Sequence, residues 1–164
     1  GEETDHPVAS TDYAIWQQRF TRMIDLDLTA PANLSYLVAR SLIAREAPGV
    51  IVNVGSRGAF RGEPDAPAYA AAKAGLHALG QSLAIALAPH GIAVASVAPG
   101  FISTERQQPK LEGAGGVALR SQSPFGRVGT ADEVAAAILY LTSPAAQWAS
   151  GTILDLNGAS HLRS

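Results

Sequence analysis

The sequence of 164 residues contains no cysteine. This absence excludes a disulfide scaffold, a thiolate nucleophile and a zinc or iron–sulfur site with cysteine ligands. Charge is also scarce, because only 16% of the residues are charged and the net charge is −2. A chain without excess positive charge lacks the electrostatic footprint of a nucleic-acid or acidic-membrane binder. We therefore expect a cytoplasmic protein without nucleic-acid or membrane partners.

Long apolar runs are missing as well, since no stretch approaches the roughly 20 residues of a membrane-spanning helix. The segment Gly1–Pro7 does not have the pattern of a secretory signal peptide. The four histidines show no metal-ligand spacing, so no metal site is predicted. What the chain does have is 47% hydrophobic residues, which is too many for a disordered protein and enough for the core of one domain.

Apolar strands alternate with helices along the chain. Helical spacing of apolar residues predicts helices over about 12–28, 28–46, 68–88 and 131–141. Short apolar runs bounded by turn residues predict strands over 50–54, 92–97 and 152–156, with loops over 57–67 and 101–129. Such alternation implies right-handed crossovers and a parallel sheet, which is an α/β fold.

Two turns follow predicted strands, at Gly55-Ser56 and at Pro99-Gly100. In open parallel sheets, ligands bind outside the carboxyl ends of the strands, so both turns are expected to border one site. The helix over 68–88 begins between them in the sequence. It carries Tyr69 and Lys73, which share a face because they are four residues apart.

This pattern suits proton transfer to an oxygen atom. A tyrosine phenol has a pKa of roughly 10, and a nearby ammonium group favours the phenolate and brings that pKa toward the working range. The hydroxyl of Ser56 can hydrogen-bond a substrate oxygen, so Ser56, Tyr69 and Lys73 together can serve a carbonyl or an alcohol. No side chain donates hydride, so a cofactor is implied. Either feature alone also arises by chance, and a serine after a strand is commonly a turn residue.

Five stretches then carry a family resemblance. They are Asn53-Val54-Gly55-Ser56, Tyr69-Ala70-Ala71-Ala72-Lys73-Ala74-Gly75-Leu76, Val97-Ala98-Pro99-Gly100-Phe101-Ile102-Ser103-Thr104, 126–135 and 151–158. From about Trp16 to Ala159 the chain resembles the second half of a short-chain dehydrogenase/reductase, most like the 3-oxoacyl-[acyl-carrier-protein] reductases. The resemblance implies a Rossmann-like, doubly wound parallel sheet. Residues 1–164 would form a single partial domain, its C-terminal part with about three strands.

The resemblance also implies roles for the catalytic residues. Tyr69 would be the general acid that protonates the carbonyl oxygen. Lys73 would lower the pKa of Tyr69 and hydrogen-bond the nicotinamide ribose, and Ser56 would orient the carbonyl. Asp27 stands where the family often has an asparagine that supports a proton-relaying water. Its charge would pair with Lys73 if the two were close, which leaves that relay open.

The cofactor would be NAD or NADP, and the sequence does not choose between them. By resemblance, Tyr69 and Lys73 would touch the cofactor, and Pro99 and Gly100 would let the backbone approach the nicotinamide. The backbone of Ile102 and the hydroxyl of Thr104 would hold the carboxamide and the phosphates. The segment 101–123 would cover the substrate. The family's glycine-rich turn lies in a first half that these residues lack, so the 164 residues alone are expected to bind dinucleotide weakly or not at all.

Two functions therefore stand beside each other. One is an NAD(P)-dependent oxidoreductase that interconverts a small-molecule carbonyl and a secondary alcohol. The other is a non-catalytic fragment that acts as an oligomerisation or interaction module. In the family, the helices matching 29–46 and 68–88 pair across subunits, so a homo-oligomer, a dimer or a tetramer, is expected. We expect His77 on a helix surface or interface, and Trp16 and Trp148 as packing anchors.

Overall fold

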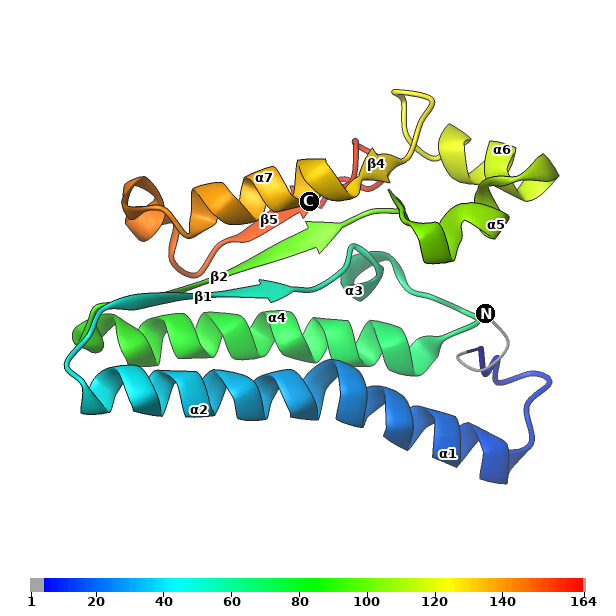
Figure 1. The fold of residues 1–164 in the computed structure, drawn as a ribbon. Coiled ribbons are helices and arrows are strands. Elements are labelled where there is room, and N and C mark those ends of the chain that lie inside the picture. Colours follow the sequence, from blue (N-terminus) through cyan, green and yellow to red (C-terminus); the bar gives the residue numbers. More distant parts are fainter. Residues whose placement is uncertain (1–4, 164) are drawn as a thin grey trace.

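Three parallel strands form the sheet of the computed structural model, which describes residues 5–163 apart from the side chains of Arg106 and Ala114. They are β1 (Gly49–Val54), β2 (Ile92–Pro99) and β5 (Ile153–Leu156), in the order β1-β2-β5. The register places Val52 opposite Ala95, and Val97 opposite Leu154. The predicted parallel sheet is confirmed, and helices lie on both of its faces (Figure 1).

The middle strand, β2, is buried at all eight positions. Side chains alternate between the faces of a strand, so β2 contributes to two separate cores. Ile92 and Val94 belong to one apolar cluster, and Ala95 and Val97 belong to the other. Burial on both faces explains why the strand has a continuous apolar sequence rather than an alternating one.

One long helical run crosses the first face of the sheet, beside α4 (Pro67–Leu87) (Figure 1). It consists of α1 (Tyr13–Ile24), a π-helical turn η1 (Asp25–Thr29) and α2 (Ala30–Ala44). The sequence predicts two helices that meet at residue 28, whereas the structure continues through that point with one wider turn. π-helical turns are rare and frequently occur at functional sites. Here the turn carries Asp27.

The ends of α4 are both fixed by specific contacts. At its start, the Ala68 amide donates a hydrogen bond of 3.2 Å to Nε2 of the buried His6, so the N-terminal segment supplies an acceptor to the first turn. After α4, a short 3₁₀ turn η2 (Ala88–His90) leads to Gly91, whose φ is +69°. This is the glycine end of the helix that the sequence predicts.

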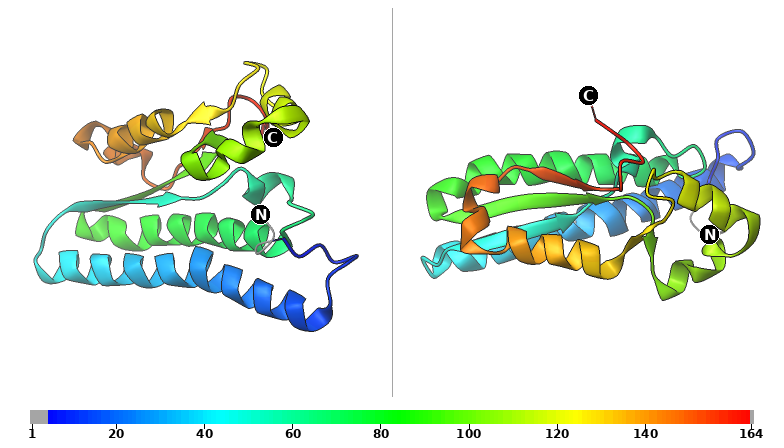
Figure 2. Two further views of the ribbon diagram at one scale, coloured as in Figure 1. Left: turned by 45° about the vertical axis from the view of Figure 1, so that its right-hand side comes forward. Right: turned by 90° about the horizontal axis from the view of Figure 1, so that it is seen from above.

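The segment expected to be loop contains short regular elements. They are α3 (Gly58–Arg61), β3 (Ile102–Ser103), the 3₁₀ turn η3 (Glu105–Gln107), α5 (Gln108–Leu111), α6 (Gly113–Ser121) and β4 (Gly129–Thr130). Strands β3 and β4 pair as a second, two-stranded sheet. Figures 1 and 2 show α5 and α6 beyond the carboxyl ends of β1 and β2. Glycine has low helix propensity, which is why the sequence 113–116 predicts a loop.

Helix α7 (Ala131–Leu141) covers the second face and is followed by the 3₁₀ segment η4 (Pro144–Ala149). Its start is a capping box, in which the Glu133 amide donates to Thr130 Oγ1 at 3.2 Å and the Thr130 amide donates to Glu133 Oε2 at 2.9 Å. Trp148 in η4 is fully exposed, so its prediction as a packing anchor is wrong within one chain. Trp16 packs on Phe20, with ring centroids 4.9 Å apart.

Arg127 sets the charge state of this cap. Its two terminal nitrogens bind the Glu133 carboxylate at 2.9 and 2.6 Å. The hydrogen bond from Arg127, followed by the one from the Thr130 amide, lowers the pKa of Glu133 to about 2. A carboxylate whose pKa is lowered by folding stabilises the folded state above its unfolded pKa of roughly 4.3, and the contribution is lost as pH falls toward the folded value.

We therefore predict a pH-dependent cost for Glu133→Gln. The variant should unfold at a lower temperature than the wild type at pH 7, and this difference should shrink as the pH falls from about 5 toward 2. Thermal unfolding followed by circular dichroism across that range measures it. Asp132→Asn, one residue earlier in the same first turn, is the matched control. A Glu133→Gln effect of the same size at pH 3 and pH 7 would contradict the prediction.

Candidate functional site

Most of the predicted site residues border one cavity at the carboxyl ends of β1 and β2. Ser56, Tyr69, Gly100, Ile102, Thr104 and Asp27 line this space of about 560 Å³. We call it the catalytic cavity. The backbones of the two strand ends are tied together, because the Gly55 amide donates to Val97 O at 2.9 Å. Pairing of β1 with β2 thus places Ser56 beside Gly100, although 43 residues separate them.

Lys73 lies one helical turn after Tyr69 and is held behind it. Its Nζ atom is 5.7 Å from the centre of the Tyr69 ring, and it donates a hydrogen bond of 3.3 Å to Val54 O. It also forms an ion pair of 2.9 Å with Asp27 Oδ1. The Lys73 and Asp27 side chains are only 12% and 26% exposed, so solvent screens this pair less than it screens a surface pair.

Asp27 is therefore close enough to Lys73 to pair with it. The π-helical turn η1 brings its carboxylate to Lys73, and the positive charge beside Tyr69 is balanced by a negative charge of this chain. An ionised carboxylate only accepts hydrogen bonds, whereas an asparagine amide also donates them. A water at this position would have to donate to Asp27.

His77 contacts the turn at Ser56. Its side chain is buried, whereas from the sequence we expect it on a helix surface or interface. Its Nε2 atom lies 3.4 Å from both the amide nitrogen and the carbonyl oxygen of Ser56, and its ring stacks on Phe60 at 5.2 Å. A Cβ atom on Gly55 would lie 2.2 Å from the His77 ring, so only glycine fits there. Burial lowers the pKa of His77, which keeps the ring neutral at pH 7. The sequence does contain a signal for His77, because Tyr69, Lys73 and His77 follow one another at intervals of four residues and therefore share one face of α4.

Gln107 is a cavity residue that sequence reasoning missed. It lies in η3 and lines the catalytic cavity, and its Oε1 atom is buried without a hydrogen-bond partner in the described part of the chain. A buried amide oxygen without a partner costs free energy, so the position suits a ligand that donates to it. Nothing in the sequence marks Gln107, because its place depends on how the segment after β2 folds. In residues 5–163, no group of three histidine, aspartate or glutamate side chains is placed to hold a metal ion.

A family model described as enoyl-(acyl carrier protein) reductase matches residues 5–161. The chain belongs to the short-chain dehydrogenase/reductase family. The "FixR" protein of Bradyrhizobium diazoefficiens is 42% identical over 142 residues, which cover 86% of this chain and 49% of FixR. The 3-oxoacyl-[acyl-carrier-protein] reductase of Vibrio cholerae is 34% identical, with coverage of 89% and 59%. The chain thus spans about half to three fifths of the length of these curated relatives.

Solved structures share the fold. A crystal structure from Agrobacterium tumefaciens with bound NADP, described as a candidate 2-deoxy-d-gluconate 3-dehydrogenase, matches with a TM-score of 0.85 and 30% identity. The match covers 95% of this chain and 62% of that one. The Rossmann-like α/β class of the short-chain dehydrogenase/reductases is therefore established for this chain. Among residues 5–163, no helix has the length and apolar character needed to cross a membrane.

In this short-chain dehydrogenase/reductase site, Gly100 also needs to be glycine. A Cβ atom there would lie 3.0 Å from the Cα and Cβ atoms of Asn157, so a side chain would push β5 away from the end of β2. The Pro99 carbonyl accepts a hydrogen bond of 3.0 Å from the Arg57 amide. The backbone after Pro99 thus passes close along the cavity wall that Gly100, Ile102 and Thr104 form.

The Asp27–Lys73 ion pair should be energetically coupled more strongly than an exposed pair. A double-mutant cycle with Asp27→Asn and Lys73→Met should give a coupling free energy of about 1–2 kcal/mol, because both side chains are largely shielded from water. The free energy of unfolding in urea is the measurement. The pair Asp155–Arg163, at 2.8 Å with both side chains 32% exposed, is the matched control. Equal coupling in the two cycles would refute the shielding argument.

Proposed function

We propose that this chain forms the catalytic part of an oxidoreductase that interconverts a carbonyl compound and a secondary alcohol, with NAD or NADP as the redox partner. One observation carries the proposal. Ser56 and Tyr69 border the same cavity, and the ammonium group of Lys73 stands directly behind the phenol ring. Two segments, the turn after β1 with Ser56 and the helix α4 with Tyr69 and Lys73, thus converge on the place where an oxygen atom would react. The family membership of the chain supports this reaction class.

Each residue has a distinct task in the reduction. Ser56 Oγ donates a hydrogen bond to the carbonyl oxygen and fixes its position. Tyr69 Oη gives its proton to that oxygen as negative charge develops there, so the product is an alcohol and Tyr69 is left as a phenolate. Lys73, anchored by Val54 O and Asp27, stabilises the phenolate until solvent returns the proton. When bound, a reduced nicotinamide supplies the hydride that the carbonyl carbon takes up.

The cavity suits the nicotinamide end of such a cofactor. The hydroxyl of Thr104 and the ammonium of Lys73 are donors for ribose, amide or phosphate oxygens, and the unpartnered Gln107 Oε1 is an acceptor for an amide N–H. Gly100 and Ile102 offer a wall without a charged group. The NADP-containing structure from Agrobacterium tumefaciens supports a nicotinamide cofactor. The glycine-rich turn that holds the pyrophosphate in the family is not found in these 164 residues.

A carbonyl in a small organic molecule is the proposed substrate. The 3-oxoacyl reductase from Vibrio cholerae and the enoyl reductase named by the family model act on different groups, a ketone and a carbon–carbon double bond. The hydroxyls of Ser56 and Tyr69, with the ammonium group of Lys73 beside them, provide hydrogen bonds and a proton to an oxygen atom, which favours the ketone. The resemblance of residues 69–76 and 97–102 to the 3-oxoacyl reductases supports a ketone on a carbon chain as the reacting group.

Tyr69→Phe should lower the turnover of purified protein by about 10²–10⁴-fold, because it removes the general acid but keeps the ring. The measurement is ethyl acetoacetate reduction followed through the absorbance of NADH and of NADPH. Cofactor binding, followed by nicotinamide fluorescence, should stay within a few-fold of wild type. Tyr140→Phe, on the exposed side of α7, is the control. Unchanged turnover in Tyr69→Phe would refute the assignment.

A second function, assembly with another copy of this chain, has its own observation. Helix α2 presents an apolar row to solvent, in which Leu34, Tyr36 and Leu37 are each more than 60% exposed. On the neighbouring α4, the alanines at positions 71, 74 and 78 are also exposed, and small residues allow helices to approach closely. The two helices thus offer a self-complementary face of the kind that symmetric dimers bury.

Leu37→Glu should convert an oligomer into monomers, since it places a charge in the centre of that face. Sedimentation velocity measures the mass, and Val117→Glu on α6, where the valine is 60% exposed, is the control. A protein that assembles through this face but neither binds NADH nor NADPH supports the assembly function over the enzyme. A monomeric wild type overturns the assembly function.

A further inference from the structure

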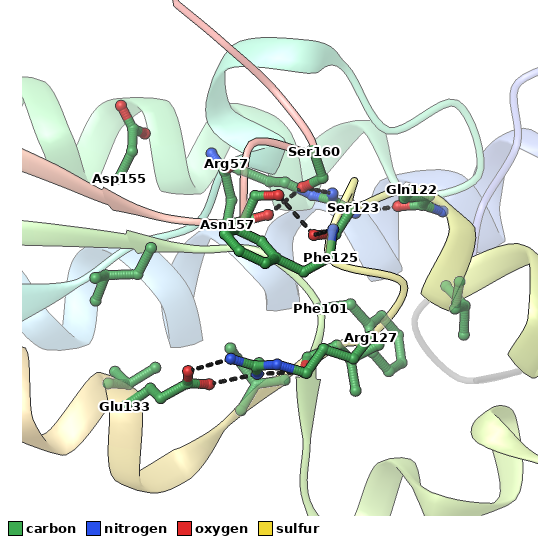
Figure 3. Close-up of a pocket in the computed structure, with 17 residues that line it drawn as sticks. Arg57, Phe101, Gln122, Ser123, Phe125, Arg127, Glu133, Asp155, Asn157 and Ser160 are labelled. Carbon is green, nitrogen blue, oxygen red and sulfur yellow. Dashed lines mark hydrogen bonds and ion pairs between the residues drawn. The ribbon is translucent and has the colours of Figure 1, made fainter.

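Arg57, the residue directly after Ser56, has an unusual environment. Its side chain is only 6% exposed, and Figure 3 shows it extending toward Ser160 and Gln122. One terminal nitrogen donates to Ser160 Oγ and the other to Gln122 Oε1. Both acceptors are neutral. None of the four ion pairs found among residues 5–163 includes Arg57. A buried cation with neutral partners alone is costly unless something else balances its charge.

The neighbouring charges do not supply that balance, because each carboxylate is already paired. Glu63 pairs with Arg61 at 3.4 Å, Glu133 pairs with Arg127, and Asp155 pairs with Arg163. Burial and then Arg61 lower the pKa of Arg57, while Glu63 raises it; a guanidinium nonetheless keeps its proton at neutral pH. Each of these ion pairs has no net charge, so none of them balances the positive charge of Arg57.

Arg57 also stands between two cavities. One is the catalytic cavity, and the other is a pocket of about 310 Å³ that we call the side pocket (Figure 3). Arg57, Phe101 and Ile102 line both spaces, so these residues form the boundary between the two. The side pocket is lined further by Leu119, Phe125, Val134 and Leu156, which are apolar, and its volume is that of a small-molecule site.

We propose that Arg57 binds the carboxylate of the substrate, and that this site therefore acts on oxo acids or hydroxy acids whose carbon chain reaches into the side pocket. The inference rests on the proposed function, because it takes the reacting carbonyl to lie at Ser56 and Tyr69. Ser56 and Arg57 both line the catalytic cavity, so one small molecule in it borders both residues. The planar guanidinium matches a carboxylate in a two-bond geometry, and one positive charge balances one negative charge.

A carboxylate fits better than a phosphate. A phosphate monoester carries about −1.5 to −2 charges at pH 7 and generally meets several cations. In the side pocket the second arginine, Arg127, is occupied by Glu133. Lys110 borders the catalytic cavity but not the side pocket. Among the described residues that line the side pocket, Arg57 is the one cation without a paired carboxylate, and one positive charge favours a monoanion.

The test compares acids with neutral ligands of the same shape. Dissociation constants are measured by NMR for 2-, 3- and 4-oxopentanoate, each beside its amide, on purified wild-type protein and on Arg57→Gln. At least one acid should bind wild type about 10-fold tighter than its amide, the size expected of a charge-assisted pair of hydrogen bonds. Arg57→Gln should abolish that preference and leave the amide affinity unchanged. Arg57→Lys keeps the charge and should retain part of the preference, also if Arg57→Gln fails to fold.

Arg61→Gln is the matched control, because Arg61 also donates to Gln122 Oε1 but is paired with Glu63. It should keep the acid preference. Equal affinities of acid and amide for the wild type would overturn the inference, and so would equal losses in Arg61→Gln and Arg57→Gln. Tighter binding of dihydroxyacetone phosphate than of every oxo acid would overturn the choice of carboxylate.

The two proposals fail in different ways. If the protein binds acids more tightly than amides but reduces no ketone, the proposed function is refuted and Arg57 is an anion-binding residue. If the wild type reduces ethyl acetoacetate but does not bind acids more tightly than amides, the proposed function is supported and carboxylate binding by Arg57 is refuted. When both hold, kcat/KM for the preferred acid should fall about 10-fold in Arg57→Gln, while kcat/KM for its amide stays constant.

Discussion

The burial of β2 between β1 and β5 is the constraint on which the rest of the structure depends. Its central position forces the turns after β1 and β2 to the same edge of the sheet, and this alone brings Ser56 next to Gly100. The helices on the first face add the remaining parts. Helix α4 presents Tyr69, Lys73 and His77 on successive turns, and the π-helical turn beside it brings Asp27 to Lys73. The site is therefore a product of the whole packing arrangement.

Charge pairing gives this site its particular character. Lys73 is balanced by Asp27, Glu63 by Arg61, and Glu133 by Arg127. Among the described residues, Arg57 stands out against these pairs, because its side chain is buried and forms no ion pair. In the proposed reaction, Ser56 and Tyr69 would stabilise the negative charge that develops on the substrate oxygen, and Arg57 would bind an anionic group of the substrate.

The parallel sheet, the main helices and the cavity residues Ser56, Tyr69 and Gly100 are predicted from local patterns. The cavity residues Asp27, Ile102 and Thr104 are expected only from the family resemblance. Apolar runs identify β1 and β2, and the interval of four residues between Tyr69 and Lys73 defines a helix face whatever surrounds it. The buried place of His77 and the role of Gln107 depend on tertiary packing, which local spacing does not encode. The glycines at 113–116 disfavour a helix locally, yet α6 forms there, since packing overrides propensity. Likewise, no sequence signal marks that the Arg57 guanidinium hydrogen-bonds neutral side chains in the described part of the chain.

The π-helical turn has one more consequence, which concerns the phase of the long helical run. Successive residues of an α-helix advance by about 100° around its axis, so a turn that holds one extra residue rotates everything before it relative to everything after it. The buried positions of α1 and those of α2 consequently do not follow one continuous helical periodicity in the sequence, although they face the same side in the structure. Removing one residue between 25 and 29 would restore a regular helix, turn Met23 out of its buried position and carry Asp27 away from Lys73. The extra residue in the π-helical turn thus determines whether Asp27 is placed to pair with Lys73.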